Sequence, residues 1–298
     1  MTEEAAAIPE PVGHTVAEPV TEPGVDETTE IVIRPRKGWI NIDWAEISHY
    51  RELLYFLVWR DVKIRYKQTV LGVAWAVLQP VFSMIVFTVI FGKFAKIPSD
   101  GIPYAVFVYA GLLPWTFFAN GVTHAGLSLV SQQNLLTKIY FPRLFVPAAA
   151  IGGGFVDLAI SFGVYAVILA AYGVAPGWGT VFVPLLLLFT IMAALGLGCL
   201  LAALTVSYRD FRYVVPFMMQ ALMYLSPVVY PVSLIPRQYH WLLALNPMAG
   251  IIDAYRSAIL GKPWNLTTLA VSGGVTLLLL VFGMFYFRKT ERRFADIA

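Results

Sequence analysis

Four cationic side chains lie close together just before a long uncharged run: Arg60, Lys63, Arg65 and Lys67. Cations at the edge of an apolar segment attract anionic groups, such as the phosphate or diphosphate of a lipid-linked molecule. Ordinary anionic lipids would be attracted by the same side chains. We therefore predict a headgroup site or entrance here, and the pattern alone leaves both ligands open.

The remaining polar residues offer little catalytic chemistry. The chain has four His and a single Cys, Cys199, which lies inside an apolar run. Asp157 is an isolated acid in an otherwise apolar segment, which makes it a functional candidate or a hydrogen-bond partner of Ser161. Asp253 and Arg256 are the one pair that could serve a membrane enzyme acting on glycans or lipids. We predict no catalytic residues and no metal site.

The composition indicates the environment of these residues. Hydrophobic residues make up 58% of the 298 residues and charged residues only 13%, whereas soluble domains carry about 25% charged residues. The charges lie between long uncharged runs, which is typical of a polytopic helical membrane protein. The net charge of +3 is small, so nucleic acid is not indicated as a partner.

Six runs are apolar and long enough to cross a bilayer, because a spanning helix needs roughly 20 residues. They are Thr69–Gly92, Tyr104–Ser128, Phe145–Tyr172, Trp178–Val206, Tyr213–Ile235 and Leu266–Phe287. Between the last two, an apolar stretch is broken at Asn246-Pro247. This break predicts two short helices that re-enter the membrane from outside. A stripe of small residues, Ala194, Gly198 and Ala202, predicts close helix packing within or between subunits.

The basic residues orient these spans, since inner loops are enriched in Lys and Arg. With a cytoplasmic N-terminus, thirteen basic residues near the spans lie inside: Arg51, Arg60, Lys63, Arg65, Lys67, Lys138, Arg143, Arg209, Arg212, Arg288, Lys289, Arg292 and Arg293. Five lie outside: Lys93, Lys96, Arg237, Arg256 and Lys262. We therefore expect both termini in the cytoplasm.

The chain divides into four parts. Residues 1–37 are acidic and rich in Pro, and we predict a disordered cytoplasmic tail. Residues 38–67 predict an amphipathic interfacial helix, residues 68–287 a transmembrane domain, and residues 288–298 a basic cytoplasmic tail. The helix carries an apolar stripe, which we expect to lie in the membrane interface, although packing on a soluble domain is the alternative. The stripe comprises Ile47, Tyr50, Leu54, Leu57 and Val58.

Several short motifs occur in a fixed order along roughly residues 40–290. They are Arg65-Tyr66-Lys67 with Thr69, Leu71, Gly72, Trp75, Leu78 and Pro80; Tyr140-Phe141-Pro142-Arg143; Tyr208-Arg209-Asp210; Ser226-Pro227-Val228-Val229-Tyr230-Pro231; and Asn246-Pro247. Together they resemble the permease subunits of ABC-2 type transporters, and more narrowly those of bacterial O-antigen, capsule and teichoic-acid exporters.

The resemblance implies an all-α half-transporter, similar to type V exporters, in the bacterial inner membrane. It implies a homodimer that binds two ABC ATPase subunits and moves a lipid-linked polysaccharide. The sequence contains no G-x-x-x-x-G-K-[ST] phosphate loop, so we expect ATP and Mg to be bound by the partner and no cofactor to be bound directly. Teichoic acid, capsule, lipo-oligosaccharide and drug substrates stay open, and a passive channel is a more distant alternative.

Two further groups of residues are predicted to serve this transport. The polar end of the second span and the loop after it are expected to dock on the ATPase, together with two residues before the fifth span, although solvated loops and membrane anchors are the alternatives. This coupling group is Gln132, Gln133, Leu135, Leu136, Lys138, Tyr140, Phe141, Arg143, Arg209 and Asp210. Aromatic and Met side chains would let a sugar polymer slide, although such residues also simply pack helices. This pathway group is Trp75, Phe82, Met218, Met219, Tyr224 and Tyr230.

Overall fold

The computed structural model describes residues 50–67, 72–133 and 141–291, which all belong to one compact unit, Trp39–Ala298. The regular structure of these residues is helical, and no strand occurs among them, so the all-α prediction is confirmed. The longer helices are α2 (Arg51–Lys67), α3 (Gly72–Phe87), α4 (Tyr104–Ser131), α6 (Phe145–Gly152), α7 (Phe155–Ala171), α8 (Val183–Ser207), α9 (Phe211–Leu225), α11 (Pro247–Leu260) and α12 (Leu266–Glu291). The shorter ones are the π-helix η1 (Thr88–Phe94), α10 (His240–Ala244) and the 3-10 turns η2 (Trp178–Phe182), η3 (Val232–Leu234) and η4 (Arg237–Tyr239).

Within the described residues, five helical segments are long and apolar enough to cross a membrane. They are Ala74–Phe94, Tyr104–Ser131, Phe145–Ala171, Trp178–Ser207 and Leu266–Glu291. These segments match the first four predicted spans and the last one. A sixth span stays a prediction.

The fifth predicted span, Tyr213–Ile235, is not one continuous helix. Its helix, α9, has 15 residues, which gives about 22 Å at 1.5 Å per residue, against a hydrocarbon core of about 30 Å. The helix stops at Ser226, whose backbone is extended (φ −94°, ψ 147°). The cause is Pro227, because the residue before a proline is sterically pushed out of the helical region.

Helix α4 lies at the centre of the core. Most of its side chains are buried, and it packs on α3, α6, α7, α8, α9 and α11. The small-residue stripe of α8 faces α4: a Cβ added at Gly198 would lie 2.8 Å from the Cβ of Ala125. The predicted close packing of this stripe is therefore confirmed, and it occurs within one chain.

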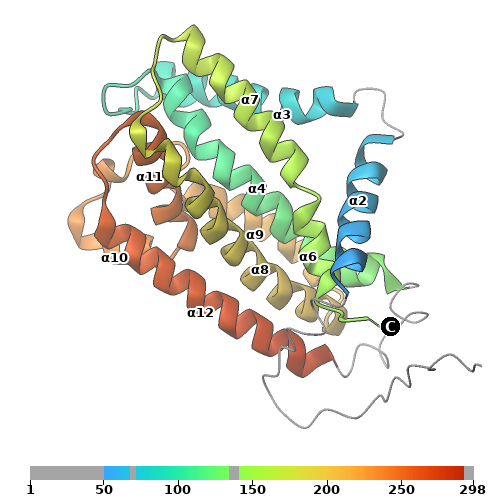
Figure 1. Ribbon diagram of the computed structural model, residues 1–298. Coiled ribbons are helices and arrows are strands. Elements are labelled where there is room, and N and C mark those ends of the chain that lie inside the picture. Colours follow the sequence, from blue (N-terminus) through green and yellow to red (C-terminus); the bar gives the residue numbers. More distant parts are fainter. Residues whose placement is uncertain (1–49, 68–71, 134–140, 292–298) are drawn as a thin grey trace, which may run out of the picture. The chain divides into compact units, whose positions relative to one another are not determined.

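On its other side, α8 packs directly against the backbone of α12, and both run alongside α4 in Figure 1. A Cβ added at Gly283 of α12 would lie only 2.0 Å from the carbonyl oxygen of Gly196 in α8. A glycine is required here because no side chain fits between the two backbones.

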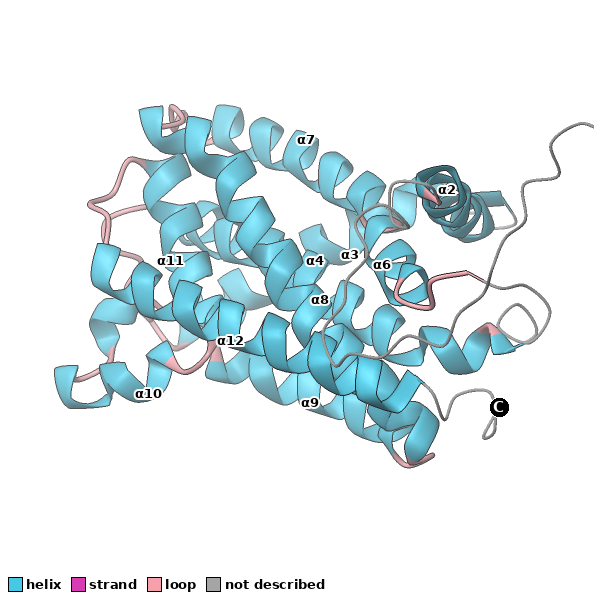
Figure 2. Cartoon of the chain, turned by 60° about the horizontal axis from the view of Figure 1, so that its bottom comes forward, coloured by secondary structure: helices cyan, strands magenta, loops and turns pink. Residues whose placement is uncertain are grey.

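Helix α2 has a different direction from the long helices. Figure 2 looks nearly along α2, whereas α7 and α12 run across the same view. It packs mainly on α6. We use the term α2 end for the end of the bundle where α2, α6 and the last turn of α12 lie, and α11 end for the opposite one.

The connection before α12 contains the predicted interruption. Asn246 caps α11, because its side-chain oxygen accepts a hydrogen bond from the backbone N–H of Met248 at 3.0 Å, and Pro247 occupies the first turn. Gly261 ends the helix with φ 68°, a conformation that favours glycine. The break between two helices is confirmed, whereas re-entry into a bilayer stays a prediction.

Candidate functional site

At the α2 end, the apolar stripe of α2 is covered by protein. Leu57 is 4% exposed and belongs to a cluster with Phe145 and Val146 of α6. The stripe therefore packs on α6 within the described residues, and the interfacial position of the helix stays a prediction. Ile47 lies outside the residues that the structure describes. The surface of α2 that stays exposed carries Tyr55, Phe56, Trp59 and Ile64.

The end of α2 is fixed to the start of α7 by one carboxylate. Asp157 accepts hydrogen bonds from the Arg65 guanidinium and from the Tyr66 hydroxyl, and it forms an ion pair with Arg65. Burial, and next the contact with Asp157, raise the pKa of Tyr66 above its ordinary range, so the hydroxyl keeps its proton. The Ser161 hydroxyl donates to the backbone carbonyl of Asp157 at 2.8 Å and not to its carboxylate. The carboxylate bonds to Arg65 and Tyr66 of α2.

The structure places all four predicted entrance residues on α2, where two of them form ion pairs and two are exposed. Arg60 pairs with its neighbour Asp61 at 2.8 Å, and Arg65 is paired with Asp157. Lys63 and Lys67 are exposed. These two lysines are therefore the cations best placed to meet an external anion.

A glycine lets α2 approach α6 closely. A Cβ added at Gly152 would lie 2.8 Å from Cγ2 of Val58, which is closer than real Cβ contacts come. The contact lies next to the boundary between α6 and α7. The position of α2 is therefore set on one side by this backbone approach and on the other by Asp157.

The predicted coupling group is only partly described. Leu135, Leu136, Lys138 and Tyr140 lie outside the described residues, whereas Gln133, Arg209 and Asp210 are exposed. Arg143 donates to the carbonyl oxygen of Glu291 at 2.6 Å and so joins the start of α6 to the end of α12. The role of this group in coupling stays a prediction.

One detail of the coupling prediction is wrong. Phe141 is 5% exposed and packs in the cluster with Leu57 and Phe145, so it does not belong to an exposed docking surface. Helix α4 itself ends at Ser131, because Gln132 leaves the helical conformation (φ −117°, ψ 27°), and Gln133 is helical again. Serine hydroxyls near the end of α4 bond to its last carbonyls, as with Ser131 and Ser128 O at 3.0 Å, and this favours termination.

The pathway residues on α3 form an exposed stripe. Trp75 is 60% exposed and Phe82 is 68% exposed, and Leu78 and Gln79 are exposed between them. The spacing of three and four residues places them on one face of the helix. This face covers no other element within the described residues.

Helix α9 carries a second such stripe, which differs in part from the prediction. Tyr224 is exposed, but Met219 is 5% exposed and packs into the core, so it does not line an open path in this structure. The residues that accompany Tyr224 are Tyr213 and Phe217, which are 83% and 73% exposed. Tyr213, Phe217 and Tyr224 are spaced by four and seven residues, and this helical spacing could have indicated from the sequence that they share one face. Met218 is half-buried, and Tyr230 donates its hydroxyl to the carbonyl oxygen of Tyr224 at 3.3 Å.

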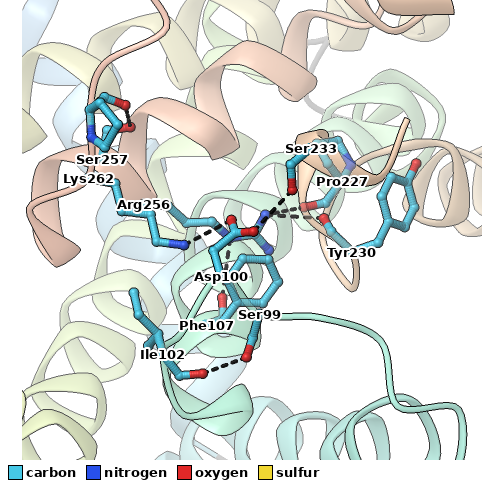
Figure 3. A network of polar contacts seen from close by, with 11 residues as sticks. Ser99, Asp100, Ile102, Phe107, Pro227, Tyr230, Ser233, Arg256, Ser257 and Lys262 are labelled. Carbon is cyan, nitrogen blue, oxygen red and sulfur yellow. Dashed lines mark hydrogen bonds and ion pairs between the residues drawn. The ribbon is translucent and has the colours of Figure 1, made fainter. Parts of the chain in front are cut away.

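At the α11 end, Arg256 holds the segment that follows α9 (Figure 3). Its guanidinium donates to the carbonyl oxygens of Pro227, Val228 and Tyr230 at 2.6, 2.5 and 3.4 Å, and to that of Phe107 at 3.3 Å. It also lies 3.7 Å from the centre of the Phe107 ring. The carbonyls of the non-helical segment after α9 thus receive donors from one buried side chain.

This environment removes Arg256 from the candidates for catalysis. The side chain is 2% exposed and its donors are engaged. Burial lowers the pKa of Arg256 to about 10, whereas the nearby Asp253 carboxylate acts in the opposite direction, so the guanidinium keeps its charge at neutral pH. The Asp253–Arg256 pair was the one candidate for the alternative of a membrane enzyme, and in this structure Arg256 has a structural role.

A surface contact connects three loops at the same end. Asp100 accepts hydrogen bonds from Lys262 and from Ser233, each at 3.0 Å. Its backbone has φ 53°, which is unusual for a residue other than glycine. The loops before α4, after α9 and before α12 therefore meet at one carboxylate (Figure 3).

Taken together, the site has several apolar spanning helices, a crosswise helix fixed at one end and two exposed aromatic stripes, and these features are typical of a membrane transport protein. Residues 52–260 match the family of ABC-2 type transporters, and the chain belongs to this family. It is 31% identical to the O-antigen export system permease protein RfbA of Myxococcus xanthus, over 71% of this chain and 82% of that protein.

Two other relatives have related names. The O-antigen export system permease protein RfbA of Klebsiella pneumoniae is 27% identical, over 84% of this chain and 96% of that protein. The polysialic acid transport protein KpsM of Escherichia coli is 24% identical, over 78% of this chain and 91% of that protein. The similarity extends along most of the described helices.

Proposed function

We propose that this protein is the permease subunit of an ATP-driven exporter that moves a lipid-linked, O-antigen-like polysaccharide across the bacterial inner membrane. The observation that carries the proposal is the similarity to O-antigen and polysialic acid export permeases over 71–84% of the chain. Teichoic acid, capsule, lipo-oligosaccharide and drug substrates are the alternatives within the same family.

The energy would come from a separate ABC ATPase subunit. The sequence contains no phosphate loop, so ATP and Mg would be bound by the partner. A homodimer of this chain would associate with two ATPase copies. The segment from Ser131 to Arg143 and the pair Arg209–Asp210 would receive the motion of the ATPases, because they follow helices that end at the α2 end.

The proposed topology has six spans with both termini in the cytoplasm. Five of the spans are the long apolar segments, and α9 with the residues up to Ile235 would be the fifth in order. Helices α10 and α11 would dip into the outer side of the membrane. The excess of Lys and Arg at the α2 end supports this orientation.

In this arrangement α2 would lie along the cytoplasmic surface of the membrane and act as an entrance gate. Its exposed Tyr55, Phe56 and Trp59 suit the headgroup region, where aromatic side chains are enriched. Its exposed Lys63 and Lys67 would attract the phosphate of a lipid-linked substrate.

The two exposed stripes on α3 and α9 would line the path of the polymer. Each combines aromatic side chains with one exposed amide, Gln79 on α3 and Gln220 on α9. Aromatic faces can stack on sugar rings and an amide can exchange hydrogen bonds with hydroxyls, without binding tightly. A second copy of the chain would complete the wall of the path.

The decisive experiment is deletion of the gene for this chain in its own host. We expect glycan linked to undecaprenyl diphosphate to accumulate inside the cells, and the full chain supplied on a plasmid to restore export. A deletion strain with normal export and no accumulated glycan would refute the proposed function. Analysis of the sugars in accumulated glycan would identify the substrate.

A further inference from the structure

A cavity lies between α2, α6 and the last turns of α4. Its volume is about 310 Å³, near the lower end of the range of about 300–1,000 Å³ for small-molecule sites. Three residues of α2 line it, Asp61, Ile64 and Arg65. The rest of the wall is formed by His124, Ser128 and Ser131 of α4, by Gln132 just after α4 and by Ala150 of α6. The cavity is therefore suited to a ligand of one or two rings.

The two charged residues in its wall already have partners. Arg65 is paired with Asp157, and Asp61 is paired with Arg60. A phosphate in this cavity would have to compete with the Asp157 carboxylate for Arg65. The charges in the wall are thus balanced by neighbouring residues, which favours an uncharged ligand over an anion.

The uncharged groups in the wall offer hydrogen-bond acceptors. The side-chain oxygen of Gln132 is buried and has no hydrogen-bond partner among the described residues, so the side chain must turn toward the cavity before a ligand hydroxyl can reach this oxygen. The Nδ1 atom of His124 lies 2.6 Å from the carbonyl oxygen of Asn120. Because a carbonyl only accepts, Nδ1 carries the hydrogen in the neutral ring and Nε2 is left as an acceptor. Two acceptors beside the apolar Ile64 suit a ligand that carries several hydroxyl donors on an apolar frame.

We propose that this cavity binds a sugar ring of the substrate, with sugar hydroxyls donating to Gln132 Oε1 and His124 Nε2. This inference rests on the proposed function, since it assumes a lipid-linked glycan. The diphosphate of the same molecule would be left to the exposed Lys63 and Lys67. The cavity would thus distinguish a lipid that carries sugar from one that does not.

Cysteine labelling can test the cavity in the complete transporter. Cys199, the only cysteine of the natural sequence, is buried, so Ser131→Cys adds one exposed thiol in the cavity wall. The rate of maleimide labelling is measured for the permease–ATPase complex in lipid nanodiscs. The two probes are undecaprenyl diphosphate that carries one N-acetylhexosamine and undecaprenyl diphosphate without sugar.

We expect the probe with sugar to slow labelling of Ser131→Cys by about fivefold, as about 80% occupancy would, and the probe without sugar to leave the rate nearly unchanged. Tyr208→Cys is the matched control, because Tyr208 is exposed at the end of α8 and does not line the cavity. Its labelling rate should be the same with and without either probe.

Variants then assign the contacts. On the Ser131→Cys background, Gln132→Ala and His124→Ala should each abolish protection, whereas Gln132→Glu, which keeps an acceptor, should retain it. Asn120→Ala, one turn earlier on α4, should not alter it, because the contact of His124 is to the Asn120 backbone.

Equal protection by both probes would overturn the proposal in favour of phosphate binding. If neither probe slows the labelling of Ser131→Cys, the proposal is also overturned. In both cases the proposed export function is judged separately, by glycan accumulation in the deletion strain.

Discussion

Arg65 at the end of α2 and Asp157 at the start of α7 form an ion pair between residues 92 positions apart in the sequence. The same carboxylate accepts the hydroxyl of Tyr66. The final turn of α2 is therefore joined to the start of α7. Any movement of α2 that opens an entrance must break these contacts or carry α7 with it.

Replacing the carboxylate should loosen α2. In Asp157→Asn the ion pair is lost, and losing a hydrogen bond to a charged group costs about 1.5–3 kcal/mol. We expect hydrogen exchange of the α2 backbone, residues 51–67, to become about tenfold faster or more. Glu52→Gln removes an exposed acid from α2 itself and should leave the exchange rate unchanged. Equal protection of α2 in Asp157→Asn and the natural protein would contradict a fastening role.

Tyr66 should titrate at unusually alkaline pH. Because burial and Asp157 raise its pKa, the protonated form is favoured by the folded state. Its contribution to stability is complete below the ordinary tyrosine pKa of about 10 and is lost as the pH rises through the higher folded value. The measurement is the phenolate absorbance of the natural protein minus that of Tyr66→Phe. A difference curve centred at the ordinary tyrosine value would show that the hydroxyl is not engaged.

The contact between α2 and α6 should be sensitive to one methyl group. A Cβ at position 152 would meet Cγ2 of Val58 at 2.8 Å, and overpacking of this kind costs about 1–3 kcal/mol. Gly152→Ala should therefore increase hydrogen exchange of α2, and Val58→Ala in the same chain should restore part of the protection. Gly163→Ala is the matched control, because a Cβ there meets nothing within 4 Å. Simple additivity of the Gly152 and Val58 substitutions would argue against direct contact.

Arg256 should be essential for the stability of the α11 end. Arg256→Met would leave four carbonyl oxygens without this donor and should lower stability by about 3 kcal/mol or more, because each buried acceptor left unsatisfied costs about 1–3 kcal/mol. Arg256→Lys keeps the charge but cannot reach all of these oxygens, so it should also destabilise the protein. The measurement is thermal unfolding of the detergent-purified chain, with the exposed Arg212→Lys as control. Normal stability of Arg256→Met would refute this role.

The two exposed stripes should be needed for export. Trp75→Ala and Tyr224→Ala remove large aromatic surfaces that are exposed on α3 and α9, and we expect each to reduce polymer export by about tenfold or more, equivalent to about 1.4 kcal/mol. Phe282→Ala on α12 removes a comparably exposed ring from a helix without a predicted pathway role. Surface glycan per cell, corrected for protein level, is the readout. Normal export by both α3 and α9 variants would remove these residues from the path.

Local patterns in the sequence were sufficient to predict the helices. Uncharged runs correctly predicted the helices that begin at Tyr104 and Leu266, and the pair Asn246-Pro247 correctly predicted where α11 begins. Pro216 lies inside α9 without ending it, whereas Pro227 does end it. The difference is one of packing, because Val215 and Met219 on either side of Pro216 are buried in the core.

The contacts between distant segments could not be predicted in the same way. Nothing near Asp157 in the sequence indicates Arg65 as its partner, because the pair forms only when α2 folds back over α6 and α7. The same applies to Arg256, whose acceptors lie on α4 and on the segment after α9. The sequence marked both residues as unusual charges, but their partners depend on tertiary packing.

The direct backbone contact between Gly283 and Gly196 has a consequence for measuring motion in this protein. Two helices that touch through their backbones cannot slide past each other without losing this contact. Helix α8 also packs closely on α4, where a Cβ added at Gly198 would lie 2.8 Å from the Cβ of Ala125. These three helices therefore form a fixed reference frame. Distances from a spectroscopic label on α12 to labels on α2, α3 or α9 would report the displacement of the moving helix alone.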